Sequence, residues 1–250
     1  IYDELYLWEE EGLIEHILVR HEQGAAHAAD AYARASGKVG ICFATSGPGA
    51  TNLVTGIATA DMDSIPMILI TGQVGRAFIG TDAFQEVDIY NITKPIVKAS
   101  YVVNDASMIP EIVSEAFYLA KNGRPGPVLI DIPKDIQFAK TNYSKPKIEK
   151  KLNGKSHNKF SQTDIEKFID LILKAKKPVI YSGGGVINSG PKASEALREF
   201  ARLTGFPITS TLQGLGAFPG DDDQFLGMLG MHGTYYANMA TTECDVLLAA

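Results

Sequence analysis

The sequence contains few cysteines and none in a metal-type pattern. Cys42 and Cys244 are the two cysteines among 250 residues, and both lie in apolar runs without a metal-type partner at short spacing. This placement is typical of buried thiols in a reducing compartment and speaks against a disulfide or a zinc site.

Long apolar runs and an excess of positive charge are also missing. No run approaches the roughly 20 apolar residues that a membrane-spanning helix needs, and no secretory signal is visible. The formal net charge of −6 provides no basic field that would attract nucleic acid. The chain begins with Ile1 and stops inside an apolar run at Ala250, so we interpret it as an internal piece of a longer polypeptide.

Short apolar runs alternate with longer amphipathic segments, in a chain that is 45% hydrophobic and 21% charged. This alternation predicts an α/β fold, with three-layer α/β/α domains and mostly parallel sheets. Strands are expected at 16–19, 39–44, 66–70 and 128–132, and helices at 25–35, 50–61 and 108–121.

Composition changes after residue 139, where Lys, Asn and Ser become frequent. A basic stretch could bind phosphate or nucleic acid, but the composition favours a solvated linker. We therefore expect one domain at 1–140, a linker at 141–160 and an incomplete second domain at 161–250. In the second domain we expect a helix starting at Thr163-Asp164, a glycine turn at 183–185, further helices at 193–203 and 235–242, and strands at 178–181, 206–211 and 245–249.

Glu22 is the first candidate for chemistry. It lies where the expected strand 16–19 runs into an alanine-rich helix, and ligands of open α/β sheets bind at the carboxyl ends of strands. Taken alone, Glu22 could equally be a carboxylate that interacts favourably with the helix dipole.

The turn Ser46-Gly-Pro48-Gly-Ala-Thr-Asn52 lies between a strand and a helix. Successive backbone N–H groups there could bind phosphate. However, the turn matches neither the dinucleotide fingerprint nor the P-loop.

The run HEQGAAHAADAYARASG, which contains Glu22, resembles the pyrimidine-binding domain of thiamine diphosphate (ThDP) enzymes. The resemblance implies that Glu22 hydrogen-bonds the N1′ atom of the cofactor's aminopyrimidine. That chemistry calls for a dry pocket and a raised carboxyl pKa. The turn with Pro48 and Asn52 resembles the segment beside the pyrimidine ring, where it would shape and pack the cofactor site.

The segment GTDAFQEVD at 80–88 resembles the acetohydroxyacid synthase branch of this family. In that branch the residues matching Phe84 and Gln85 lie near the reacting carbon, where a neutral amide can stabilise a developing oxyanion. The alternative is a helix N-terminus capped by Thr81 or Asp82, with Gln85 as its capping-box partner. Gly75 departs from the family, which usually has proline there.

The segment GRPGPVLIDIPKD at 123–135 is similar to the last strand of the family's pyrimidine domain. The resemblance implies that Arg124 contacts a flavin and that Lys134 lies at the substrate channel. Without the resemblance, Arg124 would be interpreted as a surface turn residue and Lys134 as a solvated charge at a strand end.

The second domain resembles the family's central FAD-binding domain. Its glycine turn is an incomplete Rossmann signal, because Asn188 stands where the third glycine should be. The resemblance, strongest in the run MLGMHG, implies FAD contacts at Gly183, Gly184, Gly185, Thr211, Leu212, Leu229, Gly230, Met231 and His232.

The resemblance implies a parent enzyme that decarboxylates pyruvate on ThDP and ligates the two-carbon unit to pyruvate or 2-oxobutyrate, in branched-chain amino-acid biosynthesis. It implies FAD, and Mg²⁺ with ligands outside this chain, because the diphosphate domain is missing. A homodimer or homotetramer and a small regulatory subunit are expected, in the cytoplasm or in an organelle if a presequence precedes Ile1. The alternatives are a sister ThDP oxidase or decarboxylase, or a non-catalytic dinucleotide-binding module for the piece alone.

Overall fold

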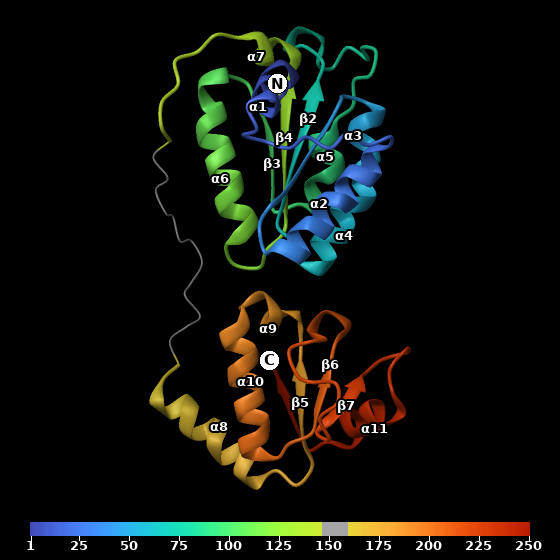
Figure 1. Cartoon of the computed structure of the whole chain (residues 1–250), viewed down its shortest axis with the longest axis vertical. Coiled ribbons are helices and arrows are strands. Elements are labelled where there is room, and N and C mark those ends of the chain that lie inside the picture. The colour runs from blue at the N-terminus through green and yellow to red at the C-terminus, as the bar shows by residue number, and fades with distance from the viewer. Residues whose placement is uncertain (147–159) are drawn as a thin grey trace. The chain divides into compact units, whose positions relative to one another are not determined.

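The computed structural model describes residues 1–146 and 160–250, and the chain divides into two compact units, Ile1–Gly154 (unit 1) and Lys155–Ala250 (unit 2) (Figure 1). Each unit contains a four-stranded sheet whose paired strands are all parallel. The predicted α/β class is confirmed. Most of the expected linker at 141–160 lies outside the described residues.

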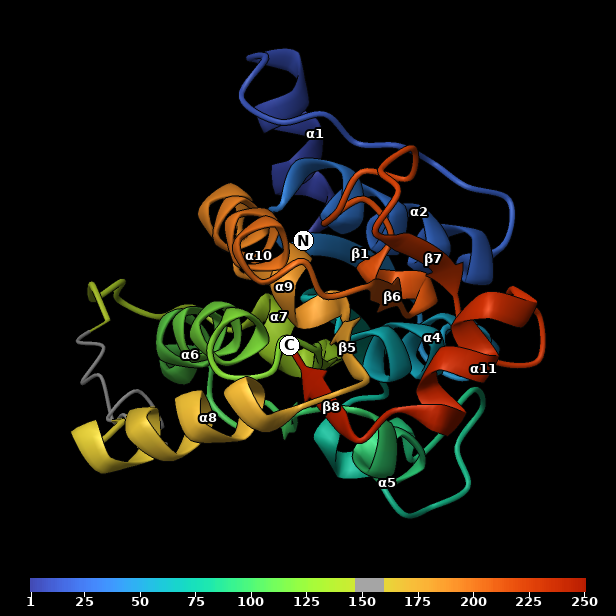
Figure 2. The ribbon, with the colours of Figure 1, turned by 90° about the horizontal axis from the view of Figure 1, so that it is seen from below.

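Unit 1 is a parallel sheet with helices on both faces. Its strands are β1 (Gly40–Ala44), β2 (Met67–Gln73), β3 (Ala99–Val102) and β4 (Pro127–Pro133), in the order β1-β2-β4-β3. Its helices are α1 (Tyr2–Glu10), α2 (Glu22–Ser36), α3 (Pro48–Asn52), α4 (Val54–Asp63), α5 (Ile89–Thr93), α6 (Ile109–Lys121) and α7 (Lys134–Phe138), with short 3-10 turns at Arg76–Phe78, Lys94–Ile96 and Ala106–Met108. Helix α6 lies on one face and α2, α4 and α5 lie on the other (Figures 1 and 2).

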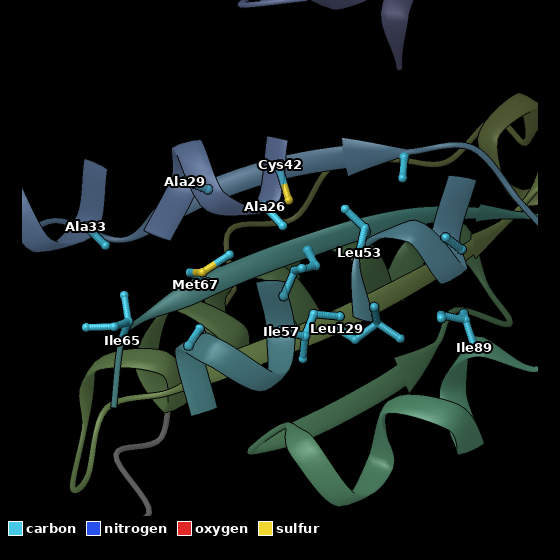
Figure 3. Packing of buried hydrophobic residues seen from close by; sticks show 14 residues of the cluster. Ala26, Ala29, Ala33, Cys42, Leu53, Ile57, Ile65, Met67, Ile89 and Leu129 are labelled. Carbon is cyan, nitrogen blue, oxygen red and sulfur yellow. The ribbon is translucent and has the colours of Figure 1, made fainter. Parts of the chain in front are cut away.

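The strands of unit 1 are apolar on both faces, as a covered parallel sheet requires. In β2, Met67 and Leu69 face α2 and α4, whereas Ile68 joins the cluster beneath α6. Figure 3 shows the first cluster, in which alanines of α2 face β1 and β2. Small side chains at this contact allow the helix backbone to approach the sheet closely.

We expect Gly40→Ala to destabilise the chain by about 1–3 kcal/mol, the usual cost of overpacking. A Cβ on Gly40 would lie 2.1 Å from the backbone oxygen of Ala29 in α2, and neither backbone can move freely. Gly24→Ala is the matched control, since a Cβ there would meet nothing within 4 Å. Denaturant unfolding measures both variants, and equal stability of Gly40→Ala and the unmodified chain would contradict the close approach.

Unit 2 repeats the alternation of strands and helices. Its strands are β5 (Pro178–Ser182), β6 (Ile208–Ser210), β7 (Phe225–Met228) and β8 (Val246–Ala249), in the order β7-β6-β5-β8. Its helices are α8 (Gln162–Lys174), α9 (Gly184–Asn188), α10 (Pro191–Thr204) and α11 (Tyr235–Glu243), with a 3-10 turn at Leu212–Gly214. Across the two described ranges, no helix is both long and apolar enough to cross a membrane.

Three predictions about local structure were wrong. Residues 16–19 form no strand, and Leu18 is 85% exposed. No described strand pairs with this segment, and a single strand has no partner for its backbone hydrogen bonds. The helix expected at 50–61 is divided at Leu53 into α3 and α4. Helix α8 is capped by Ser161 in a capping box with Asp164, so it begins before the predicted Thr163-Asp164 start.

The two cysteines differ in burial. Cys42 lies in the core of unit 1, where burial raises the pKa of its thiol to about 12. Cys244 is only partly buried, and its thiol donates to the carbonyl oxygen of Thr241. The prediction of buried thiols is therefore confirmed for Cys42 alone.

Candidate functional site

Glu22 is the first residue of α2 and lies against the turn that follows β1, at the carboxyl edge of the unit 1 sheet. The strands of unit 1 point toward this edge, which is the upper end of that unit in Figure 1. His21 caps the helix, because its Nδ1 accepts a hydrogen bond from the N–H of Gln23 at 3.1 Å. The side-chain amide of Asn52, in α3, donates to Oε2 of Glu22 at 3.0 Å. Two predicted site residues that are 30 positions apart are thus in direct contact.

In this structure the pKa of the Glu22 carboxyl group is lowered, whereas the sequence predicted a raised pKa in a dry pocket. The hydrogen bond from Asn52 is the largest cause that lowers the pKa, followed by a bond from the backbone N–H of Glu22 itself. Desolvation opposes this shift but is weaker, because the carboxyl group is only partly buried. The side chain is therefore an ionised, accessible acceptor at neutral pH.

The turn before α3 packs closely around Glu22. A Cβ on Gly49 would lie 3.2 Å from Oε1 of Glu22 and 2.6 Å from the methyl carbon of Thr45. Pro48 is the first residue of α3 and is exposed. The absence of a side chain at Gly49 therefore lets the turn pack directly against the carboxylate of Glu22.

The loop at 79–88 adds Gln85 to this edge. A Cβ on Gly47 would lie 2.8 Å from the carbonyl oxygen of Gln85 and 2.9 Å from its Cα, so the loop backbone rests on the turn. Gln85 has a positive φ of 60°, and the neighbouring Phe84 is 88% exposed. The structure brings the segments of Glu22, Asn52 and Gln85 together.

The capping interpretation of this loop was wrong. No helix begins at Thr81 or Asp82, and α5 begins at Ile89 with Asp88 as its cap. The loop is instead closed on itself by Glu86, whose carboxylate accepts from the backbone N–H groups of Gly80 and Ala83. Sequence reasoning missed this role of Glu86, although a carboxylate three residues after Ala83 could have indicated it.

Gly75 precedes the loop in a conformation that proline also adopts. Its φ is −57°, and a Cβ there would make only ordinary contacts, at 3.7 Å to Phe78 and 3.8 Å to Asp135. The departure from the family's proline therefore leaves the course of the backbone unchanged.

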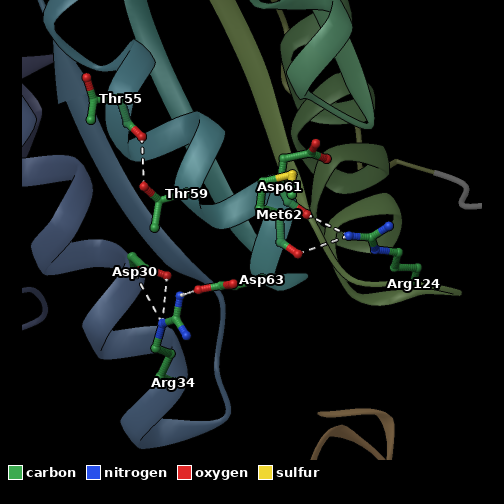
Figure 4. A network of polar contacts seen from close by, with 8 residues as sticks. All are labelled: Asp30, Arg34, Thr55, Thr59, Asp61, Met62, Asp63 and Arg124. Carbon is green, nitrogen blue, oxygen red and sulfur yellow. Dashed lines mark hydrogen bonds and ion pairs between the residues drawn. The ribbon is translucent and has the colours of Figure 1, made fainter. Parts of the chain in front are cut away.

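Lys134 and Arg124 lie at opposite ends of strand β4. Lys134 is exposed and follows β4 at the carboxyl edge, the edge of Glu22. Arg124 precedes β4, and its Nε donates to Ser64 Oγ at 2.7 Å. Its Nη2 donates to the carbonyl oxygens of Asp61 and Met62 (Figure 4). Arg124 thus caps the carboxyl end of α4, a role that sequence reasoning missed.

The predicted flavin contacts of unit 2 gather at the carboxyl edge of its own sheet. They follow β5 at Gly183, Gly184 and Gly185, β6 at Thr211 and Leu212, and β7 at Leu229, Gly230, Met231 and His232. Gly184 and Gly185 lie in the short helix α9, although the sequence predicted a glycine turn. A Cβ on Gly184 would lie 2.9 Å from the Cβ of Gln213, so this glycine allows α9 to pack against the turn after β6.

The loop after β7 is held by Asn238, which sequence reasoning missed. Its side chain accepts from the N–H of Gly230 at 2.9 Å and donates to the carbonyl oxygen of Gly230 at 3.0 Å. Met231, at the tip, is 91% exposed. At the ends of β5 and β6, the hydroxyls of Ser182 and Ser210 are buried without a hydrogen-bond partner. Within 1–146 and 160–250, no group of three or more His, Cys, Asp or Glu side chains is arranged to hold a metal ion.

Comparison with known families places both units. Residues 3–92 match the thiamine pyrophosphate enzyme N-terminal TPP binding domain, and residues 165–250 match the central domain of the same enzymes. The chain belongs to the thiamine pyrophosphate enzyme family. Thiamine pyrophosphate is another name for ThDP, so the family implied by HEQGAAHAADAYARASG is confirmed.

Within this family, the chain is similar to acetolactate synthase large subunits. It is 58% identical to that of Cyanidium caldarium over all of this chain and 43% of the relative. The protein from Pyropia yezoensis is 57% identical over 42% of its length, and that from Parasynechococcus marenigrum is 56% identical over 40%. The chain therefore spans less than half the length of these relatives.

Proposed function

We propose that the whole protein is an acetolactate synthase, which joins pyruvate to a second 2-oxo acid in branched-chain amino-acid biosynthesis. The observation that carries this proposal is the contact between Glu22 and Asn52 beside Gly49, with Gln85 on the adjoining turn. Identity of 58% to an acetolactate synthase large subunit supports the branch.

The residues around Glu22 fit an aminopyrimidine. Glu22 presents a partly exposed carboxyl group that can share a proton with a ring nitrogen, and Gly49 places no side chain against its Oε1. Asn52 orients the carboxylate, and Pro48 is exposed on the adjoining turn. When bound, ThDP would supply the electron sink for decarboxylation. A ring covering Glu22 would exclude water and raise the pKa of its carboxyl group towards the range useful for proton sharing.

Three further residues of unit 1 have proposed roles toward the 2-oxo acids. Gln85 can donate a neutral hydrogen bond to an oxygen that gains negative charge. Phe84 presents an exposed ring next to it, and Lys134 provides an exposed positive charge at the same edge for a substrate carboxylate.

We assign FAD to the carboxyl edge of unit 2. The close backbone approach at Gly184 and the buried, unpartnered hydroxyls of Ser182 and Ser210 fit a polar ligand at that edge. The guanidinium of Arg124 is engaged at the end of α4, so we propose helix capping in place of its expected flavin contact. Mg²⁺ would be bound outside this chain, together with the cofactor's diphosphate.

We further propose a homodimer or homotetramer that works with a small regulatory subunit, since the relatives are called large subunits. The cytoplasm is the proposed location, or an organelle if a presequence is present.

Acetolactate formation by the whole protein, from pyruvate with ThDP, Mg²⁺ and FAD, tests the proposal. Acetolactate that depends on added ThDP is the expected product. Conversion of pyruvate to acetaldehyde or acetyl phosphate would move the protein to a sister decarboxylase or oxidase, and no pyruvate turnover would contradict the proposed activity.

A further inference from the structure

A buried polar cluster lies beneath the loop at 79–88, on the sheet face that α2, α4 and α5 cover. It consists of Thr71 and Gln73 on β2 and Asp131 on β4, which are 1%, 8% and 1% exposed. Thr71 and Asp131 are direct partners in the parallel register, so their side chains lie next to each other on the same face. None of the three belongs to the site described above.

The hydrogen bonds of this cluster have a definite direction. Thr71 Oγ1 donates to Oδ1 of Asp131 at 2.6 Å, and Gln73 Nε2 donates to Oδ2 of Asp131 at 3.0 Å. The same Nε2 donates to the carbonyl oxygen of Val87 at 2.7 Å, while Gln73 Oε1 accepts from the N–H of Val74 at 2.9 Å. The amide nitrogen of Gln73 thus donates two hydrogen bonds, and its oxygen accepts one.

Such a cluster is costly at this place in the fold. A buried carboxylate loses hydration, and no ion pair within the described residues offsets the charge of Asp131. Lower on the same face, the equivalent positions are Leu69 on β2 and Leu129 on β4, which pack without polar groups. Apolar side chains would satisfy the sheet alone, so the cluster indicates a further role.

The contact with Val87 indicates this role, because Val87 lies at the end of the loop that carries Phe84 and Gln85. The beginning of this loop is fastened by Arg76, whose Nε donates to Asp135 Oδ2 at 2.7 Å. Inside the loop the bonds are local, such as the one between Glu86 and Ala83. The bond from Gln73 to Val87 is therefore the side-chain tether between the end of the loop and the sheet.

We propose that Asp131 is a positioning residue, which orients the amide of Gln73 so that it holds Val87 and keeps Gln85 against Gly47 beside Glu22. Asp131 touches neither substrate nor cofactor in this assignment. The inference rests on the proposed function only for its consequence in catalysis, because the tether itself is a property of the folded chain.

The experiment compares Asp131→Leu, Asp131→Asn and Gln73→Leu in the whole protein. Leucine removes the acceptor that orients Gln73, and Gln73→Leu removes the tether directly. Asparagine keeps an acceptor for Gln73 and can donate its amide to Thr71, so it should restore the tether. Met67→Ala, at the start of β2 on the same face, controls for general weakening of the core.

Hydrogen exchange of the peptide 79–88 is the direct readout, measured without substrate. We expect exchange about 5- to 10-fold faster in Asp131→Leu and Gln73→Leu, the factor for losing one net hydrogen bond. Asp131→Asn and Met67→Ala should stay close to the unmodified protein. Unchanged exchange in Asp131→Leu, or equal acceleration in Asp131→Asn and Asp131→Leu, would overturn the proposal.

Kinetics in the same variants separate the tether from the proposed function. If the protein forms acetolactate, the variants with fast exchange should lose kcat/KM for pyruvate by a similar factor at unchanged ThDP affinity. Faster exchange in a protein that forms no acetolactate would leave the tether standing and reject the function. Acetolactate formation together with unaltered exchange in Asp131→Leu would support the function and reject the tether.

Discussion

Replacing Glu22 with glutamine is expected to lower acetolactate formation by about 10²- to 10⁴-fold, the usual contribution of a positioned acid–base group. The amide has nearly the same size, and its oxygen can still accept the hydrogen bond from Asn52. It cannot, however, take up and return a proton at the position where the carboxyl group would share one with the pyrimidine nitrogen. The variant should therefore fold normally and fail in proton transfer.

Initial rates of acetolactate formation measure this effect, with thermal unfolding of each variant as the check on folding. Glu15→Gln is the matched control, because Glu15 carries the same functional group on the exposed segment that precedes α2. We expect that control to keep full activity. A rate for Glu22→Gln within about twofold of the unmodified protein would remove Glu22 from the acid–base role.

The contact between Glu22 and Asn52 could not be predicted from spacing alone. The two residues lie 30 positions apart, Glu22 as the first residue of α2 and Asn52 as the last residue of α3, and helix periodicity carries no information over that distance. Both residues were predicted because the two segments resemble the same family. The structure adds that α2 and α3 begin at the same edge of the sheet, which brings the side chains together.

Strong apolar runs were predicted well, and short half-buried elements were missed. Strand β2 begins with four apolar residues and β4 is apolar except at Asp131, because helices cover both faces of the sheet. Strand β3 reads Ala-Ser-Tyr-Val and is only partly buried, so neither a continuous apolar run nor a clear alternation indicates it. Residues 16–19 show the opposite failure, since an apolar sequence without a partner strand remains exposed.

The cluster around Asp131 was missed for a different reason. The sequence Val-Leu-Ile-Asp-Ile predicts a buried strand, and the aspartate was included in a family match without a role of its own. The signal that could have been used is a charged residue, Asp131, within an otherwise apolar strand. A carboxyl group in a strand covered on both faces needs donors from the neighbouring strand, which Thr71 and Gln73 supply.

Asp131 also predicts how stability depends on pH. Burial is the largest cause that raises the pKa of this carboxyl group to about 6, against the donors Thr71 and Gln73, while the charge of Asp88 raises it further. In the unfolded chain the ordinary value is about 3.9. Between these two values the folded chain binds more protons than the unfolded chain, so the free energy of unfolding falls as pH rises.

We therefore expect Asp131→Asn to gain stability over the unmodified chain as pH rises from about 4 to about 6, and to keep that advantage above it. A difference of about two pKa units corresponds to about 3 kcal/mol at neutral pH, an upper value because asparagine does not reproduce every hydrogen bond. Denaturant unfolding at several pH values between 4 and 8 gives this difference. Asp135→Asn is the control of opposite sign, because hydrogen bonds from Arg76 lower the pKa of Asp135. Replacing this carboxylate should therefore lower stability at neutral pH. Parallel curves for Asp131→Asn and the unmodified chain would mean that this carboxyl group is not charged in a dry interior, and the tether would then have to be held by a neutral acid.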